Sequence, residues 1–591
     1  MERLDAAVRG GRPAEPAAAT ATAAGIVWRS SDGLELPDRV PLADRLVWQA
    51  RGLCPEEDLF TLFREQALAR PDQDAVVDAE GTLSYAGLYA EVLRIAGLFA
   101  DAELGPRDVI ALRMPNGRRA VAAELAVYAL GAVALPYPLG GGVRDTLSLL
   151  ERSRAAGAVF AEATDVRASA ELRRLRAVFT TAAEVPPGAR SLDAPGPPYA
   201  PAARPAPAWA PARVLVSSGS EADPKMVAYS HQAMAGGRAA YVRALAGPPS
   251  APFRPLVLVP LASSFGSLGV PVTLAVLGGT LLVQERFDAA GALRAAVRHQ
   301  ATHLFGVPTM LRRLADLPAA PDEDLSSLRS LVSSGAELPA STAAACRARF
   351  GLPVITVYGS SDGVNCHTAT PGHPAGASAG TPDPAVAALR IVRPDGGEAA
   401  AGEHGEILAK GPMTPLCYVG APELDARYRT AGGWVRTGDL GLLDEAGRLH
   451  VLGRIKNVVI RGGLTLSPAE VERELGAHPG VAEAVCVPVP DEEFGERLCA
   501  CVRPAPGTPA PTLAALTAFL GARGLERRKF PEFLVVLDRL PTGPTGKVCR
   551  RSAAAHAARV LGAAPRGRGD GPGMDRRLDH ISGNTHQPSS L

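Results

Sequence analysis

Hydroxyl groups, glycine and lysine gather in one loop of the sequence. An apolar run at 214–216 leads into this loop, whose polar and small residues are Ser217, Ser218, Gly219, Ser220 and Lys225. Backbone N–H groups and hydroxyls of such a loop can hold phosphate oxygens while the lysine offsets their negative charge. The same composition suits an ordinary surface turn, so the loop alone supports both interpretations.

Further short motifs follow in a fixed order along the chain. They are Ser333-Ser334-Gly335-Ala336-Glu337, Tyr358-Gly359-Ser360-Ser361-Asp362, Trp434-Val435-Arg436-Thr437-Gly438-Asp439, Gly453-Arg454-Ile455-Lys456 and Pro544-Thr545-Gly546-Lys547. This series resembles the adenylate-forming superfamily, which contains acyl-CoA synthetases, nonribosomal adenylation domains and firefly luciferase. The resemblance extends from about Leu59 to Arg550. It is strongest to ligases of cyclic carboxylic acids, such as cyclohexanecarboxylate or benzoate-type acids.

The resemblance implies a site for ATP and Mg²⁺. Besides the first loop, the residues at ATP-binding positions are Gly335, Ala336, Glu337, Tyr358, Ser361, Asp439 and Arg454. Gly335, Ala336 and Tyr358 match the adenine site. Asp439 matches the aspartate that accepts both ribose hydroxyls, and Arg454 matches the arginine beyond that ribose. Ser361 and Asp362 match the magnesium ligands.

Three lysines match catalytic positions of the superfamily, namely Lys547, Lys225 and Lys456. A carboxylate is a poor electrophile, so these enzymes first attach it to the α-phosphorus of ATP and displace pyrophosphate. Lys547 matches the lysine that meets the attacking carboxylate and the α-phosphate, where an ammonium stabilises the developing charge. Lys456 matches the hinge about which the small domain swings.

The resemblance also implies coenzyme A as the acyl acceptor. Arg461, Gly462 and Gly463 match the segment that lines the pantetheine channel, although two glycines before a helix also suit a plain turn. The residues expected to line the acid pocket are Ser263, Ser264, Phe265, Ser333 and Val364.

The sequence departs from the superfamily pattern at several of these positions. Glu221 and Ala222 replace threonine and glycine in the phosphate loop, and Met226 replaces the glycine after the lysine. Asp362 replaces a glutamate and shortens its reach by ~1.5 Å. Ser263 replaces a histidine common near the carboxylate, so we expect a differently gated pocket.

Apolar periodicity predicts an α/β fold. Helical faces at 59–67 and 85–99 alternate with apolar runs such as 109–112 and 133–135, an order typical of parallel sheets covered by helices. We expect a large N-terminal domain over residues 57–453, made of two α/β subdomains plus a small β-barrel. A small mobile α+β domain over 454–560 follows it. Residues 1–56 form an Ala/Pro-rich extension, predicted to be partly disordered, and 561–591 a disordered tail.

Two local predictions concern the connections between these units. The Pro/Ala-rich segment 186–211 is expected to be an exposed connection between the two α/β subdomains. Ser467, Pro468 and Glu470 are predicted to start a helix, with proline in the first turn and a capping box between Ser467 and Glu470.

Composition excludes several other classes of protein. Lys plus Arg total 62 against 61 Asp plus Glu, so no net positive field favours nucleic acid or an anionic membrane. The eight cysteines lack metal-ligand spacing and a disulfide pattern. Glycines and prolines break the apolar stretches, which argues against a membrane span, and the first residues lack the basic start and apolar block expected of a signal peptide. We therefore expect a cytoplasmic enzyme acting on a small carboxylic acid.

Three alternatives remain open at this stage. Gly359-Ser360-Ser361-Asp362-Gly363 fits the G-x-S-x-G pattern of serine hydrolases, although the turn-rich residues after it do not suit the helix that a nucleophile elbow requires. The fold could also serve as a non-catalytic nucleotide-binding scaffold. Within enzymes, the acyl group could pass to a carrier-protein thiol or an amine in place of coenzyme A.

Overall fold

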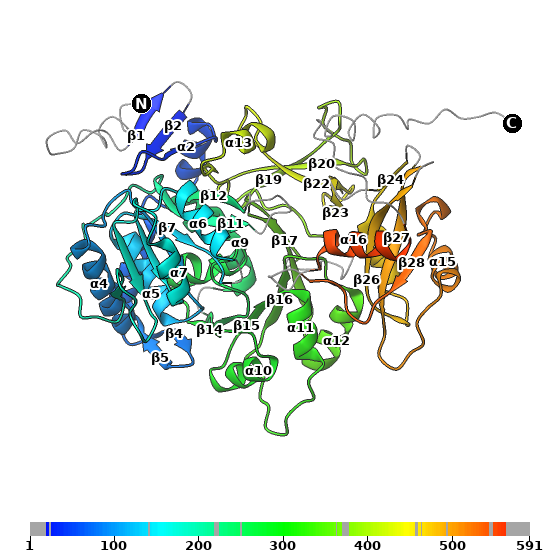
Figure 1. Ribbon diagram of the computed structural model, residues 1–591, viewed down its shortest axis with the longest axis horizontal. Coiled ribbons are helices and arrows are strands. Elements are labelled where there is room, and N and C mark those ends of the chain that lie inside the picture. Colours follow the sequence, from blue (N-terminus) through cyan, green and yellow to red (C-terminus); the bar gives the residue numbers. More distant parts are fainter. Residues whose placement is uncertain are drawn as a thin grey trace.

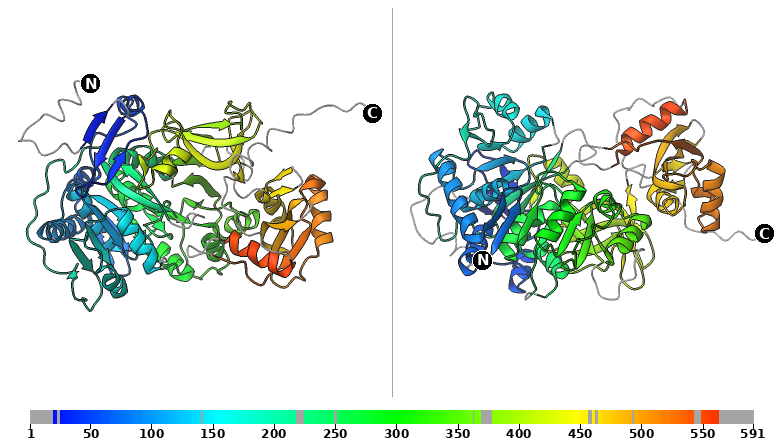
Figure 2. Two further views of the ribbon diagram at one scale, coloured as in Figure 1. Left: turned by 45° about the horizontal axis from the view of Figure 1, so that its top comes forward. Right: turned by 90° about the horizontal axis from the view of Figure 1, so that it is seen from below.

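The computed structural model describes residues 19–22, 25–139, 142–217, 224–248, 251–361, 363–368, 378–455, 459–461, 464–491, 494–542 and 548–562. A large N-terminal part carries a smaller C-terminal domain at one side, and the two further views agree on this arrangement (Figures 1 and 2). The predicted α/β class with a large and a small domain is confirmed. Among the described residues, no helix is both long and apolar enough to cross a membrane.

The first large sheet has eight strands. In spatial order they are β10 (Arg190–Ser191), β9 (Ala177–Thr180), β8 (Gly157–Phe160), β6 (Val109–Arg113), β7 (Val133–Pro136), β11 (Pro211–Ser217), β12 (Lys225–Ser230) and β21 (Cys417–Tyr418). The strands from β10 to β11 run parallel, and β12 and β21 are each antiparallel to the preceding neighbour. The helices α6 (Val143–Arg152) and α7 (Ala163–Ser169) connect strands of this sheet.

The second large sheet also has eight strands. Their order is β18 (Val364–His367), β17 (Val354–Ser360), β16 (Ser330–Ser334), β15 (His303–Gly306), β13 (Pro255–Val257), β14 (Leu281–Val283), β4 (Asp74–Asp78) and β5 (Gly81–Ser84). Its interior is parallel and its two edge strands are antiparallel. Three helices of this half are α10 (Ala289–Arg298), α11 (Pro308–Ala315) and α12 (Ala340–Phe350).

The membership of these sheets corrects the prediction of two successive subdomains. Segment 186–211 was expected to join two separate halves, but it leads from β9 and β10 to β11 of the same sheet. The hairpin of β4 and β5, near the beginning of the fold, belongs to the second sheet instead. The chain therefore crosses between the sheets more than once, because strand pairing is decided by long-range packing.

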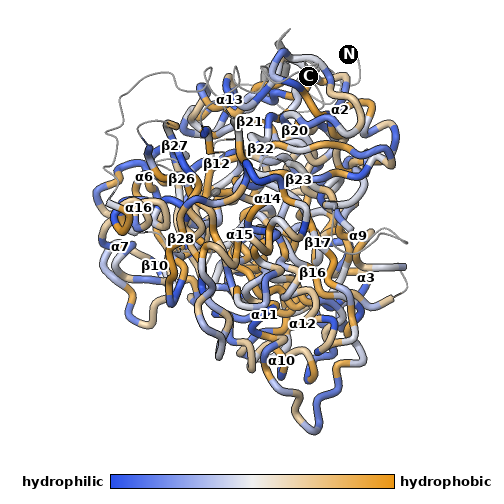
Figure 3. Tube along the Cα trace, turned by 90° about the vertical axis from the view of Figure 1, so that its right-hand side faces the viewer, coloured by the Kyte–Doolittle hydropathy of each residue, from blue (hydrophilic) through white to orange (hydrophobic). Residues whose placement is uncertain are grey.

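The main apolar core lies among helices shared by the two sheets. It is built around α3 (Leu59–Ala69), α4 (Tyr85–Asp101), α5 (Arg118–Ala129) and α9 (Ala239–Ala246). Every residue of α5 from Val121 to Ala129 is buried, as expected for a helix covered on all sides. Figure 3 shows the hydrophobic residues concentrated along the interior elements, with hydrophilic segments toward the periphery.

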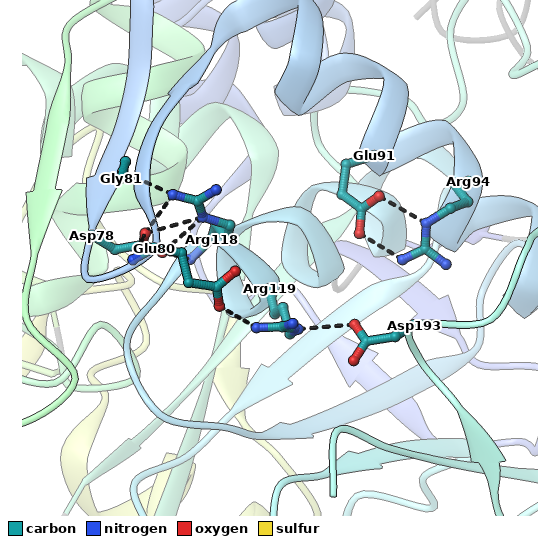
Figure 4. A network of polar contacts seen from close by, with 8 residues as sticks. All are labelled: Asp78, Glu80, Gly81, Glu91, Arg94, Arg118, Arg119 and Asp193. Atoms are coloured by element: carbon teal, nitrogen blue, oxygen red, sulfur yellow. Dashed lines mark hydrogen bonds and ion pairs between the residues drawn. The ribbon is translucent and has the colours of Figure 1, made fainter. Parts of the chain in front are cut away.

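Charged residues fasten the start of α5 to the β4–β5 hairpin (Figure 4). The N-cap residue Gly117 has no side chain, and the Asp78 carboxylate accepts the Arg118 backbone N–H at 2.8 Å in its place. The Arg118 guanidinium binds the same carboxylate, with Nη2 to Oδ1 at 2.6 Å. These bonds join an edge of the second sheet to a helix of the first.

Two smaller β structures complete the N-terminal part. Residues of the predicted extension form β1 (Ala19–Thr22), β2 (Gly25–Arg29), β3 (Glu35–Pro37) and α2 (Leu42–Ala50), so this portion of it is folded. The predicted β-barrel is a four-stranded antiparallel sheet of β19 (Ala388–Val392), β20 (Gly405–Lys410), β22 (Val435–Leu443) and β23 (Leu449–Arg454). Its described pairings run from β19 to β23 without closing into a barrel.

In its described residues, the C-terminal domain has one mixed sheet and three α-helices. The strands are β24 (Val459–Arg461), β25 (Leu464–Leu466), β26 (Val481–Asp491), β27 (Gly495–Pro504) and β28 (Phe533–Val536). The helices are α14 (Pro468–Leu475), α15 (Leu513–Ala522) and α16 (Arg550–Val560). Ser467 and Pro468 occupy the predicted N-cap and first helical positions, but the capping box is wrong: Ser467 Oγ donates to the Leu452 carbonyl, and Glu470 pairs with Lys529.

Candidate active site

Three residues from separate motifs meet beside the four-stranded sheet. The β22–β23 register sets Asp439 directly opposite Arg454, and Tyr358 reaches them from β17 of the second large sheet. Tyr358 Oη donates to Asp439 Oδ2 at 2.6 Å, and Arg454 Nε lies 2.7 Å from Asp439 Oδ1. One carboxylate thus links two sheets, and we call Tyr358, Asp439 and Arg454 the carboxylate cluster.

Burial and hydrogen bonds to Thr437 fix the position of the carboxylate cluster. Asp439 is only 4% exposed. Its backbone N–H donates to Thr437 Oγ1 at 3.0 Å, and Arg454 Nη1 donates to the Thr437 carbonyl at 3.0 Å. Burial, and next the Asp439 carboxylate, raise the pKa of Tyr358 well above its usual value. The phenol therefore stays protonated and remains a hydrogen-bond donor to Asp439.

The predicted adenine residues lie at the carboxyl ends of neighbouring parallel strands. β16 ends at Ser334, and Gly335 follows with a φ of +86°, a conformation that favours glycine. Ala336 and Glu337 continue this turn and are exposed, while Tyr358 lies near the end of adjacent β17. In open α/β sheets, ligands bind at this edge of the strands.

Ser361 lies at the turn after β17. The Tyr229 hydroxyl donates to the Ser361 carbonyl at 2.9 Å and so fastens the turn to β12 of the other sheet. The chain then continues into strand β18. A nucleophile elbow needs a helix at this point, so the serine hydrolase alternative does not fit the structure.

Lys225 is the first residue of β12, where it pairs with Ser217 of β11. Its ammonium lies 4.0 Å from the ring centroid of Tyr428 and 6.0 Å from that of Tyr418. Such cation–π contacts hold a lysine without neutralising its charge. The side chain is half-buried, and in the sequence Lys225 ends the predicted phosphate loop.

The predicted acid-pocket loop is folded back on itself. Ser263 Oγ donates to the Pro260 carbonyl at 2.7 Å and accepts the Gly266 N–H at 3.0 Å. Phe265 packs against Phe305, with ring centroids 5.8 Å apart. Ser333 is buried on β16, opposite Thr356 of β17 and Gly306 of β15.

Two predicted site residues form ion pairs with residues of the C-terminal domain. Arg461 Nη1 lies 2.8 Å from Glu532 Oε1, an ion pair within that domain. Glu337 Oε1 lies 2.7 Å from Arg473 Nε of α14. This second ion pair joins the N-terminal and C-terminal domains close to the predicted adenine turn.

Several predicted site residues lie outside the described residues: Ser218, Gly219, Ser220, Glu221, Asp362, Lys456, Gly462, Gly463 and Lys547. The side chains of Ser217 and Val364 are likewise not described, although both residues belong to strands. Sequence reasoning did not single out Tyr229, Tyr418, Tyr428 or Arg238 as site residues. No short motif marks them, because their positions depend on packing between distant segments.

The chain is similar to known adenylating enzymes over most of its length. The family model described as AMP-binding enzyme matches residues 63–419, and the model for the AMP-binding enzyme C-terminal domain matches 470–547. A feruloyl-CoA synthase of Amycolatopsis is 32% identical, over 82% of this chain and 96% of that protein. A salicyl-AMP ligase / salicyl-S-ArCP synthetase of Mycobacterium tuberculosis is 31% identical, over 86% and 93%. The solved structure of the amide bond synthetase McbA of Marinactinospora thermotolerans matches with a TM-score of 0.75 and 30% identity, over 84% and 99%.

Proposed function

The chain belongs to the family of AMP-binding enzymes, and from this membership we propose that it couples a ring-bearing carboxylic acid to coenzyme A. The enzyme is an AMP-forming acid–thiol ligase: ATP-dependent adenylation of the acid precedes thioester formation. ATP and coenzyme A are its substrates beside the acid. The aromatic or alicyclic character of that acid is the finer part of the proposal.

The carboxylate cluster is the observation that carries the assignment. A buried carboxylate on the four-stranded antiparallel sheet, bonded by a tyrosine from the second large sheet and by an arginine of its own hairpin, suits a pair of vicinal hydroxyls. We assign Asp439 to the ribose hydroxyls, Arg454 to the far side of the ribose, and the Tyr358 ring with the Gly335–Ala336 turn to adenine. Ser217, Ser218, Gly219 and Ser220, with Lys225, are assigned to the phosphates.

The chemical step needs a nucleophilic oxygen and a stabilised phosphorus. The acid carboxylate attacks the α-phosphorus of ATP, and the bond to the departing pyrophosphate breaks. We assign Lys547 to the charge that builds there, so its replacement by alanine removes about 3 kcal/mol of transition-state stabilisation. Ser263, Ser264, Phe265, Ser333 and Val364 are assigned to the acid pocket.

Mg²⁺ belongs to the finer part of the proposal. The hydroxyl of Ser361 and the carboxylate of Asp362 are oxygen donors of the kind that this ion prefers. When bound, Mg²⁺ supplies positive charge against the phosphates. The Tyr229 hydroxyl fixes the turn that carries Ser361, and so sets where this donor lies.

Acyl transfer is assigned to a second arrangement of the two domains. Lys456 stands at the boundary after β23, and we assign it to the hinge. Arg461, Gly462 and Gly463 are assigned to the pantetheine path. Because the Glu337–Arg473 ion pair crosses between the domains, a swing of the C-terminal domain would break it. A carrier-protein thiol is the second candidate acceptor, since the salicyl-AMP ligase relative is named for transfer to such a carrier.

Pyrophosphate release over a panel of aryl, alicyclic and fatty acids tests the proposal. The expected result is acid-dependent release with ring acids, and thioester formation when coenzyme A is added. Lys547→Ala should lower adenylation by roughly 100-fold or more, while Lys529→Ala, in the same domain but paired with Glu470, serves as the matched control. Adenylation at full speed without Lys547 contradicts the mechanism. Trapping of the acyl group by hydroxylamine but never by coenzyme A would point to another acceptor.

A further inference from the structure

One arginine in the core has no acidic partner among the residues that the structure describes. Arg238 ends the short π-helix η1 (Met234–Arg238) and is only 1% exposed. No carboxylate of the described residues lies within ion-pair distance of it. By contrast, the other buried arginines each have one: Arg45 with Asp38, Arg113 with Asp165, Arg213 with Glu124 and Arg429 with Asp425.

The bonds that Arg238 does make leave one edge of its guanidinium free. Nη1 donates to the Ser264 carbonyl and to Ser267 Oγ, both at 2.9 Å. Nε and Nη2 are buried and have no hydrogen-bond partner among the described residues. These two nitrogens share the side of the guanidinium that binds a carboxylate through two parallel bonds. Arg45 uses this same edge on Asp38, at 2.9 and 3.0 Å.

The guanidinium is held in this place. It lies 5.2 Å from the centre of the Tyr229 ring, and the Tyr229 hydroxyl in turn holds the Ser361 turn. The preceding residue, Gly237, packs so closely that an added Cβ would meet the Met413 nitrogen at 2.3 Å. The backbone that carries Arg238 is therefore tightly packed, the side chain is almost fully enclosed, and a buried charge without an anion is costly.

Arg238 also borders the predicted acid pocket. Its two bonds go to the loop that carries Ser263, Ser264 and Phe265, and these three residues are half-buried. The unused charge therefore lies next to the place where the acid is expected. π-Helical turns such as η1 are rare and frequently lie at functional sites.

We infer that Arg238 binds a second carboxylate of the substrate, so that the acid is a dicarboxylic acid with one reacting and one anchored group. The inference rests on the proposed function, because it takes the Ser263–Phe265 loop as the acid pocket. The anchored carboxylate accepts two hydrogen bonds, from Nε and Nη2, and neutralises the buried charge. The other carboxylate is left to attack the α-phosphorus.

The test compares ring dicarboxylic acids with their own monomethyl esters, which keep the ring and one reacting carboxylate. Adenylation is followed by pyrophosphate release, and the quantity measured is the ratio of kcat/KM for each diacid to that for its monoester. A charge-assisted bidentate pair predicts a ratio of about 10 to 100 for the best diacid. Arg238→Met should bring the ratio close to one, and Arg238→Lys should give an intermediate value. Arg243→Met, at an exposed position of α9, is the control and should keep the wild-type ratio.

The outcomes separate this inference from the proposed function. If no acid supports pyrophosphate release by the wild-type enzyme, the proposed function fails. If the wild-type enzyme is active but every diacid has a ratio near one, the inference about Arg238 is overturned. It is also overturned if Arg238→Met lowers diacid and monoester turnover equally, because Arg238 would then only shape the loop or bind the reacting carboxylate. The wild-type ratio decides the question even if the variant does not fold.

Discussion

Replacement of Asp439 by asparagine tests the carboxylate cluster most directly. Asparagine has almost the same shape, and its oxygen can still accept from Arg454 Nε, which lies 2.7 Å from Oδ1 in the wild type. The Tyr358 hydroxyl, which lies 2.6 Å from Oδ2 in the wild type, can turn its proton away and accept a hydrogen bond from the NH2 group of the asparagine. The substitution therefore removes the negative charge while keeping the packing.

The magnitude follows from the bonds assigned to ribose. A hydrogen bond to a charged group contributes about 1.5–3 kcal/mol, and one between neutral groups about 0.5–1.5 kcal/mol. The loss of charge thus weakens each of two ribose bonds by roughly 1 kcal/mol. The sum of about 2 kcal/mol predicts ATP binding weaker by about 30-fold.

Calorimetric titration with a non-hydrolysable ATP analogue measures this change, and the 2′-deoxy analogue identifies its source. Wild-type protein should discriminate against the deoxy compound, and Asp439→Asn should lose most of that discrimination. Asp444→Asn changes a carboxylate in the turn of the same hairpin, where Arg448 and His450 hold it, and should leave both affinities unchanged. If wild type and Asp439→Asn bind the non-hydrolysable ATP analogue, which keeps both ribose hydroxyls, with affinities within twofold of each other, the assignment of the cluster to ribose is refuted.

Three further predictions concern stability. Gly237→Ala should lower the free energy of unfolding by about 1–3 kcal/mol, because the new Cβ would lie 2.3 Å from the Met413 nitrogen; an unchanged thermal midpoint would contradict the close packing of η1. Burial lowers the pKa of His231 to about 4, so the unfolded chain takes up the proton first. The neutral His231 therefore contributes about 3 kcal/mol to the free energy of unfolding above roughly pH 6.5, and this contribution is lost as the pH falls toward 4. Between pH 7 and 4.5 the thermal midpoint should fall less in His231→Asn than in the wild type. Plots of thermal midpoint against pH that run parallel for the two proteins would argue against this. Arg473→Ala breaks the exposed ion pair to Glu337 and should cost less than about 1 kcal/mol; a larger loss in a chemical denaturation series would show that the pair stabilises the domain arrangement.

The local elements were largely predictable from the sequence, and their partners were not. The apolar runs 109–112 and 133–135 correspond closely to β6 and β7, since strands buried on both faces consist of continuous apolar residues. Apolar periodicity predicts where a strand lies in the sequence, but it does not predict which strand pairs with it. The assignment of β4 to the second sheet and β11 to the first therefore came only from the structure.

In the candidate site too, contacts between residues close in sequence were predictable, and contacts that depend on tertiary packing were not. Asp439 and Arg454 face each other across one hairpin, a short-range relation that ordered motifs indicate. The capping box at Ser467 does not form, because the Ser467 hydroxyl is directed to the Leu452 carbonyl and the Glu470 carboxylate pairs with Lys529. The contact with Leu452 depends on where β23 ends relative to α14, which local propensity does not specify.

Arg238 shows why a candidate specificity residue can be absent from every motif. Arg213 and Arg238 are both arginines within apolar surroundings, and both are almost fully buried. Arg213 is paired with Glu124, a residue 89 positions away, and this pairing makes its charge part of the folded core. Arg238 is fixed just as firmly but faces no such carboxylate among the described residues. The other buried guanidinium groups are neutralised by carboxylates of the protein, and leaving Arg238 without such a carboxylate adds nothing to stability. The anion that neutralises Arg238 is therefore best supplied by a ligand.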